Sequence, residues 1–422
     1  MARRIAAIAF IYACTAAAWM ILSVTMLVRT ESLDTRLHEA VGQLWGTAHT
    51  QTQPQVYYKI PSSSSLSESN EQNETVEHLA LDSSQIAVDL KLDYRRKGLL
   101  WYSVYQVQFA GQYRIANPGS QQREIYVDFA FPSEQAIYDN FRFAADGQDI
   151  TNSAFKTGRF VHAFQMDPGQ TKEIEIAYTS QGMDEWIYDF GGGVKQVRNF
   201  VFVMTTDFDR IDFPQRSVSP TVKAKTAKGW KLVWAYNNML TGACIGMTMP
   251  KKLNPGPWVS RLTAAAPVSL FLFFFLLFIC TTLREIKIHP MNYFFLGAAF
   301  FSFHLLLAYL VDFISIHIAF WICSAVSIVL VVSYMRLVAG PRFAFLEVAL
   351  FQLVYLVVFS YTFFFEGYTG LAITVLCICT LFAVMQMTGR LDWEKVFANG
   401  LPKPAKSRKP QDGGQNRPNV PD

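Results

Sequence analysis

The sequence has few charged residues and few cysteines. Asp, Glu, Lys and Arg make up 17% of its 422 residues, whereas they make up about 25% of a soluble domain. The net charge of +4 is too weak to indicate a nucleic-acid-binding protein. Of the six cysteines, only Cys244 lies outside an apolar run. We therefore expect no disulfide framework, and an oxidising compartment is neither required nor excluded.

The sequence also lacks catalytic and metal-binding motifs. It contains no HExxH, no phosphate-binding GxxxxGK(S/T) and no GxSxG, and its seven His residues have no ligand spacing. Asp207, Asp209 and Asp212 could lie near a hard cation such as calcium, but their spacing does not match a complete calcium loop. We expect no catalytic residue, no metal and no cofactor, and hence a non-enzymatic protein. A membrane enzyme is kept as a third alternative.

The spacing of long apolar runs is the main feature of the chain. Arg3 and Arg4 precede a first run, Ile5–Val28, and no second run appears until Leu262. A helix needs about 20 apolar residues to cross a bilayer, so six transmembrane helices are predicted. The five later runs are Leu262–Leu283, Met291–Leu310, Ile318–Met335, Phe343–Phe365 and Leu371–Met387.

The first run has two alternative interpretations. A cleaved signal peptide has an apolar core of about 7–15 residues, and Ile5–Val28 is longer and has no small-residue cleavage site before Arg29. Ile11–Cys14 faintly resembles a lipoprotein processing site, but the run continues past Cys14. We therefore expect an uncleaved membrane span.

Lys and Arg occur in alternate loops between the predicted spans. The positive-inside rule places such basic loops in the cytoplasm. Both termini are therefore predicted to be cytoplasmic, and the long region between the first two spans to be extracytoplasmic. The basic positions are Arg284 and Lys287, then Arg336 and Arg342, then the tail from Arg390, whereas Val311–His317 and Glu366–Gly370 have no Lys or Arg.

The region between the first two spans is predicted to be rich in β-structure. Leu33, Leu37, Val41 and Leu44 recur at helical spacing, so the first span should continue as a helix that ends before Pro54. Alternation in Tyr105–Phe109 and Glu173–Tyr178 is typical of half-buried antiparallel strands. Further strands are expected at Tyr126–Phe129, Phe141–Phe143, Phe200–Met204 and Trp230–Trp234, with turns at Asn117–Gly119, Asp146–Gly147, Asp167–Gly169 and Lys228–Gly229.

Many short strands separated by turns favour an all-β, sandwich-like domain. The predicted fold is therefore six transmembrane helices with a large extracytoplasmic β domain inserted between helix 1 and helix 2. Its parts are a first transmembrane helix in residues 1–29, a β-rich domain with an N-terminal helix in 30–261, a five-helix bundle in 262–388 and a disordered cytoplasmic tail in 389–422.

A few polar side chains lie within the predicted membrane spans. His304 and Glu347 are candidates for an intramembrane polar site, because ionisable groups in a membrane often mark an ion or proton path. A structural interpretation competes with this one. His304 could hydrogen-bond a neighbouring helix, and Glu347 is one turn from Arg342, close enough to pair with it at the interface. Asp312 lies near the predicted outer end of the third span.

A succession of residues in the carboxy-terminal half is distinctive. The third span begins His289-Pro290-Met291-Asn292-Tyr293, and the last span is followed by Arg390-Leu391-Asp392-Trp393. Together with the single amino-terminal span, the large outer domain, and Arg36, Trp45-Gly46 and Gln51-Thr52-Gln53, this closely resembles the bacterial inner-membrane CreD family. The resemblance assigns no role to the motif residues His289, Pro290, Tyr293, Arg390, Asp392 and Trp393.

The resemblance implies a Gram-negative inner-membrane protein with a periplasmic domain. Members of this family are associated with cell envelope integrity, the response to cell-wall stress and tolerance of some colicins, and are linked to a two-component regulatory system. We expect this chain to act through its periplasmic domain. Its expected partners are the lipid bilayer and a periplasmic or membrane protein, with no nucleic acid. The alternative is a small-solute or ion transporter or channel that uses the helical bundle.

Overall fold

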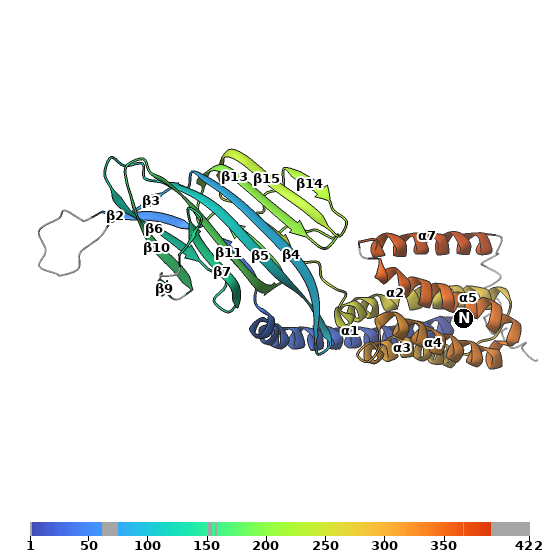
Figure 1. Ribbon diagram of the computed structural model, residues 1–422. Coiled ribbons are helices and arrows are strands. Elements are labelled where there is room, and N and C mark those ends of the chain that lie inside the picture. Colours follow the sequence, from blue (N-terminus) through green and yellow to red (C-terminus); the bar gives the residue numbers. More distant parts are fainter. Residues whose placement is uncertain (1, 61–74, 151–153, 157, 366, 390–422) are drawn as a thin grey trace, which may run out of the picture. The chain divides into compact units, whose positions relative to one another are not determined.

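The computed structural model of the chain describes residues 2–60, 75–150, 154–156, 158–365 and 367–389. In these ranges six helices are long and apolar enough to cross a membrane, and a large β-sheet region lies between the first and the second (Figure 1). The predicted fold class is thereby confirmed. The chain divides into two compact units, Met1–Met26 with Trp258–Asp422, and Leu27–Pro257. We call them the membrane unit and the β unit.

The helices coincide with the six apolar runs. Lipid offers no hydrogen-bond partner to the backbone, so a run that spans it satisfies its own N–H and C=O groups by forming a helix. The helices are α1 (Ala2–Trp45), α2 (Pro255–Leu283), α3 (Pro290–Leu310), α4 (Ile316–Ala339), a fifth span made of η1 (Phe343–Val348), α5 (Ala349–Gln352), η2 (Leu353–Val358), α6 (Phe359–Tyr361) and η3 (Thr362–Phe364), and α7 (Thr369–Thr388).

Helix α1 continues beyond its apolar run, as predicted, and ends at Trp45. Gly46 follows with a φ of +93°, a left-handed conformation that commonly ends a helix and that glycine adopts without strain. The helix thus stops well before Pro54. Of the predicted apolar stripe, Val41 packs in a small core of the β unit, with Leu37 against it, whereas Leu44 is 62% exposed.

The β unit contains three sheets of three, five and eight strands. The long hairpin β4–β5 lies near the middle of the eight-stranded sheet, in the order β14-β15-β13-β4-β5-β11-β7-β8. The strands are β1 (His49–Thr52), β2 (Gln55–Ile60), β3 (Thr75–Leu79), β4 (Ser83–Lys97), β5 (Leu100–Ala116), β6 (Arg123–Ala130), β7 (Tyr138–Ala145), β8 (Gln148–Asp149), β9 (Ala154–Lys156), β10 (Arg159–Met166), β11 (Thr171–Met183), β12 (Glu185–Asp189), β13 (Lys195–Thr206), β14 (Val222–Lys225), β15 (Trp230–Thr241) and β16 (Cys244–Thr248).

Each predicted strand lies within an observed one. Tyr105–Phe109 lies in β5 and Glu173–Tyr178 in β11, and these two strands pair antiparallel with Phe109 opposite Tyr178, so that prediction is confirmed. Phe200–Met204 in β13 pairs antiparallel with β15 but parallel with β4. Phe200–Met204 is apolar at every position, so the segment predicts a strand but does not give the direction of its pairing.

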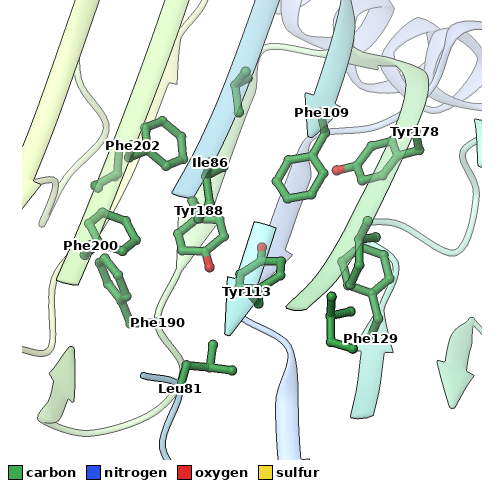
Figure 2. Close-up of a cluster of buried hydrophobic side chains, with 14 of the residues drawn as sticks. Leu81, Ile86, Phe109, Tyr113, Phe129, Tyr178, Tyr188, Phe190, Phe200 and Phe202 are labelled. Carbon is green, nitrogen blue, oxygen red and sulfur yellow. The ribbon is translucent and has the colours of Figure 1, made fainter. Parts of the chain in front are cut away.

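One aromatic core joins the three sheets. Alternate residues of the strands point inward, and the buried set includes side chains from all three sheets, so the sheets pack face to face as in a β-sandwich. Phe109 and Tyr178 stack with ring centroids 4.9 Å apart, and Figure 2 shows them beside Phe129. Such rings each bury about 150–250 Å², and this explains how the aromatic residues of the domain stabilise it.

Candidate functional site

His304, one half of the predicted intramembrane site, is packed inside the membrane unit. It is 1% exposed on α3, and its Nδ1 lies 3.3 Å from the carbonyl of Phe300, one turn earlier on the same helix. Its ring makes edge contacts with Trp19 at 5.5 Å and with Phe303 at 4.9 Å between centroids. The polar contact of His304 is therefore with its own helix.

Glu347, the other half, pairs with a residue that the sequence did not indicate. Its Oε1 atom forms an ion pair with Nη2 of Arg284, the residue that directly follows α2. The predicted pairing with Arg342 is wrong. Helix α2 packs beside the fifth span, where the Ser269 hydroxyl donates to the Tyr355 carbonyl, and Arg284 at the end of α2 meets Glu347 there. Arg284 instead approaches from another span.

The structure does not bring His304 and Glu347 together. Arg284 and Glu347 meet beside the loop that leads to Pro290, whereas His304 lies 14 residues into α3, which is about 21 Å along a helix. Asp312 lies beyond the end of α3. The predicted polar residues thus occupy different depths of the membrane unit.

The described part of the family motif begins α3 and packs it against α2. His289 is the N-cap of α3, where its Nδ1 accepts a hydrogen bond of 3.2 Å from the Met291 N–H, and Pro290 is the first helical residue. Pro suits that position because the N–H it lacks would have no helical partner. Tyr293 is fully buried, with its ring edge-on to Phe274. Arg390, Asp392, Trp393 and the rest of the predicted tail after Gly389 lie outside the described residues, as does Glu366.

The three aspartates considered for a cation have separate protein partners. Asp207 accepts a hydrogen bond from the Leu92 N–H at 2.9 Å, Asp209 pairs with Lys225 at 3.4 Å, and Asp212 accepts from the adjacent N–H of Phe213. Within the ranges that the structure describes, no three His, Cys, Asp or Glu side chains form a group that could hold a metal ion.

A groove in the β unit is the strongest candidate for a binding site. It has a volume of about 140 Å³, and we call it the amide groove. Gly46 shapes it, because a Cβ at this position would overlap the carbonyl of Gln181, so glycine permits the close approach of the two segments. The lining residues are Gln43, Leu44, Trp45, Gly46, Gln106, Gln135, Ile137, Asp139, Thr179, Ser180 and Gln181.

Polar and apolar groups in the amide groove are both free to contact a partner. The side chains of four glutamines and Asp139 make no hydrogen bond or ion pair with any residue that the structure describes. Beside them, Ile137 is 76% exposed and Leu44 62% exposed. Trp45-Gly46 forms part of the family resemblance, but the glutamines are dispersed over 139 positions, from Gln43 to Gln181, so no local pattern predicts the groove.

Comparison with known families bears on the membrane unit and the end of the β unit. Residues 236–394 match the model of the family described as Inner membrane protein CreD. Over these residues, which are less than half of the chain, the sequence is similar to the CreD family. The CreD-family region includes the five carboxy-terminal candidate spans and the motif positions from His289 to Trp393. The resemblance stated from the sequence is thereby confirmed, and the chain is an inner-membrane protein with six candidate spans in its described residues.

Other comparisons add little to the CreD-family assignment. No curated protein sequence matches the chain. A solved structure of a candidate nutrient-binding protein from Legionella pneumophila is 10% identical, with a TM-score of 0.32, covering 53% of this chain and 76% of that one. An M1 zinc metallopeptidase from Deinococcus radiodurans is 9% identical, with a TM-score of 0.23, covering 66% and 94%. Both TM-scores are too low to indicate a shared overall fold.

Proposed function

We propose that this CreD-family protein is non-enzymatic and supports cell envelope integrity and the response to cell-wall stress through contacts of its β unit. The β unit lies in the periplasm and both termini lie in the cytoplasm. The alternation of basic loops, such as the one that contains Arg284 and Lys287, with loops that have no Lys or Arg supports this orientation. The partner is a periplasmic or membrane protein.

The amide groove is the observation that supports a protein contact. Protein interfaces combine an apolar centre with a polar surround, and the exposed side chains of Ile137 and Leu44 next to unpaired amides have this composition. An amide group both donates and accepts, as the peptide groups of a protein partner do. Each hydrogen bond formed on binding contributes about 0.5–1.5 kcal/mol, so several glutamines together would favour a specific partner.

The alternative function, a small-solute or ion transporter or channel, depends on polar groups of the bundle acting together. His304 contacts its own helix, and Glu347 pairs with Arg284. Because these two polar residues have separate partners, the activity is better explained by the β unit than by the helical bundle.

The experiment compares two glutamines of the same strand. Gln106 lines the amide groove, whereas Gln112 is exposed on the same face of β5, about 20 Å further along the strand. In cells that lack the protein, Gln106→Ala combined with Asp139→Ala should abolish survival under a cell-wall-active antibiotic, and Gln112→Ala should restore it fully. A photo-crosslinker at position 106 should capture one protein under stress, and the same crosslinker at position 112 should not.

Two results would reject this proposal. Groove variants that restore survival as well as the unchanged protein, at equal membrane levels, would place the activity elsewhere. A reporter that is active only outside the cytoplasm, inserted after Pro118 between β5 and β6, should be active, and its silence would overturn the orientation.

A further inference from the structure

A groove between α1 and α2 in the membrane unit is apolar along its whole length. We call it the phenylalanine groove, and its volume is about 340 Å³, within the range of about 300–1,000 Å³ that is typical of small-ligand sites. Each helix contributes four residues at spacings of three, one and three, which places them on one helical face. They are Ile5, Ile8, Ala9 and Tyr12 of α1, and Phe271, Phe274, Phe275 and Phe278 of α2.

Three contacts establish the direction of the groove. The Tyr12 hydroxyl donates to the Pro267 carbonyl at 3.2 Å, and its ring lies 6.1 Å from that of Phe271. Eight residues earlier on α1, the guanidinium of Arg4 lies 5.8 Å from the ring of Phe278. The two helices therefore run antiparallel, and the groove ends near Arg4.

Arg4 has unpaired donors at that end of the groove. Its Nε and Nη2 atoms are buried and have no hydrogen-bond partner, and the described residues supply no ion pair to it. Glu347, at the same end of the bundle, already pairs with Arg284. A buried guanidinium without an anion is unfavourable, and the described residues supply no anion to Arg4.

Tyr293 adds a second unpaired donor. The residue is 0% exposed, and its hydroxyl makes no hydrogen bond of normal geometry to a residue that the structure describes. Its polar neighbours are Thr281 and Arg4, and its ring contacts Phe274, which lines the groove, with centroids 5.3 Å apart. The Tyr293 hydroxyl and two nitrogens of Arg4 thus have no hydrogen-bond partner among the described residues.

We propose that the phenylalanine groove binds an anionic phospholipid. One acyl chain lies between the two helical faces, and a phosphate oxygen accepts hydrogen bonds from Arg4 and Tyr293. The phenylalanine groove is apolar and ends at a cation. This matches the chemistry of a phospholipid, in which an acyl chain is joined to a phosphate. The planar guanidinium of Arg binds phosphate and carboxylate groups through two parallel hydrogen bonds.

The test uses the purified full-length protein in neutral detergent. Native mass spectrometry would measure competition between dioleoyl phosphatidylglycerol and dioleoyl phosphatidylcholine. We expect the unchanged protein to prefer phosphatidylglycerol. Arg4→Gln should reduce this preference by about tenfold or more, the effect of a hydrogen bond to a charged group. The matched control is Arg3→Gln, which removes the same charge from an exposed neighbouring residue and should change the preference by less than about twofold.

A second variant tests the acyl chain independently of the charge. Ala9→Phe places a ring in the groove while it leaves Arg4 and Tyr293 unchanged, and it should weaken binding of both lipids. Equal losses for Arg4→Gln and Arg3→Gln would overturn the proposal. Full binding by Ala9→Phe, or displacement of phosphatidylglycerol by inorganic phosphate alone, would also overturn it. These lipid measurements do not depend on the partner proposed for the β unit.

Discussion

The Tyr178 hydroxyl donates a hydrogen bond of 2.9 Å to the Oε1 atom of Gln51 in the interior of the β unit. Gln51 is on β1 and Tyr178 on β11, so the bond joins the three-stranded sheet to the eight-stranded sheet. The Nε2 atom of Gln51 also donates to the carbonyl of Ala130 in β6, at 3.1 Å, which belongs to the five-stranded sheet. One buried amide therefore connects all three sheets.

We expect Gln51→Leu to lower the free energy of unfolding of the β unit by about 2–4 kcal/mol. The change leaves the Tyr178 hydroxyl and the Ala130 carbonyl without this partner, and each buried unsatisfied group costs about 1–3 kcal/mol. Urea unfolding of the full-length protein, followed by tryptophan fluorescence, measures the loss. Gln53→Leu is the control, because Gln53 is half-buried and its side chain makes no hydrogen bond to a residue that the structure describes. Equal losses would refute the bridging role.

A second prediction concerns the pH dependence of stability. His49 lies on β1, 0% exposed, with its ring 5.7 Å from that of Tyr105 and 6.3 Å from that of Tyr138. Burial lowers the pKa of His49 from 6.5 to about 4. The unfolded chain therefore binds a proton at pH values where the folded chain does not. The stabilisation from the neutral ring is complete above about pH 6.5 and is lost as the pH falls toward 4, up to about 3 kcal/mol.

Replacement of the histidine tests this sign. We expect the difference in free energy of unfolding between the unchanged protein and His49→Phe to fall as the pH is lowered from 7.5 to 4.5. This range covers most of the interval between the two pKa values of His49. Asp184 also titrates differently in the folded protein: burial raises its pKa, and the charges of His38 and Lys251 partly oppose that rise. Because Asp184 is present in both proteins, its contribution cancels in the difference. Parallel curves for the two proteins would show that His49 does not titrate in this way.

The membrane spans and the strands could be predicted because each carries its own signal. An apolar run such as Leu262–Leu283 indicates a helix whatever its neighbours are, and alternation in Glu173–Tyr178 indicates a half-buried strand. Both signals lie within a few residues of the element that they describe.

The contacts between distant segments could not be predicted in this way. Gln51 meets Tyr178 across 127 positions, and Glu347 meets Arg284 across 63. A sequence shows which residues are polar, but the partner depends on how the helices and sheets pack. The prediction that Glu347 pairs with Arg342 failed for this reason, and the amide groove was missed for the same one.

A third prediction assigns a structural role to His289. Its Nδ1 accepts from the Met291 N–H at the start of α3, and loss of a helix cap costs about 1 kcal/mol. His289→Ala should lower the thermal unfolding midpoint of the detergent-solubilised protein, whereas His289→Asn, which keeps a capping acceptor, should restore most of it. If the asparagine variant were as unstable as the alanine variant, the imidazole would have another role.

The last prediction separates the observed partner of Glu347 from the one that the sequence suggested. The side chain of Glu347 is 22% exposed and that of Arg284 is 57% exposed, so the pair is partly shielded from water. Arg284→Ala leaves the carboxylate unpaired and should cost about 1–3 kcal/mol. Arg342 is exposed, so Arg342→Ala should change stability by less than about 0.5 kcal/mol.

Charge reversal completes this comparison. Arg284→Glu alone places two carboxylates together and should destabilise the protein more than Arg284→Ala does. Adding Glu347→Arg restores an opposite-charge pair, so the double variant should recover at least half of the loss in unfolding midpoint. A double-mutant cycle with no coupling between positions 284 and 347 would show that the ion pair does not stabilise the bundle. Coupling between 342 and 347 would instead favour the partner expected from the sequence.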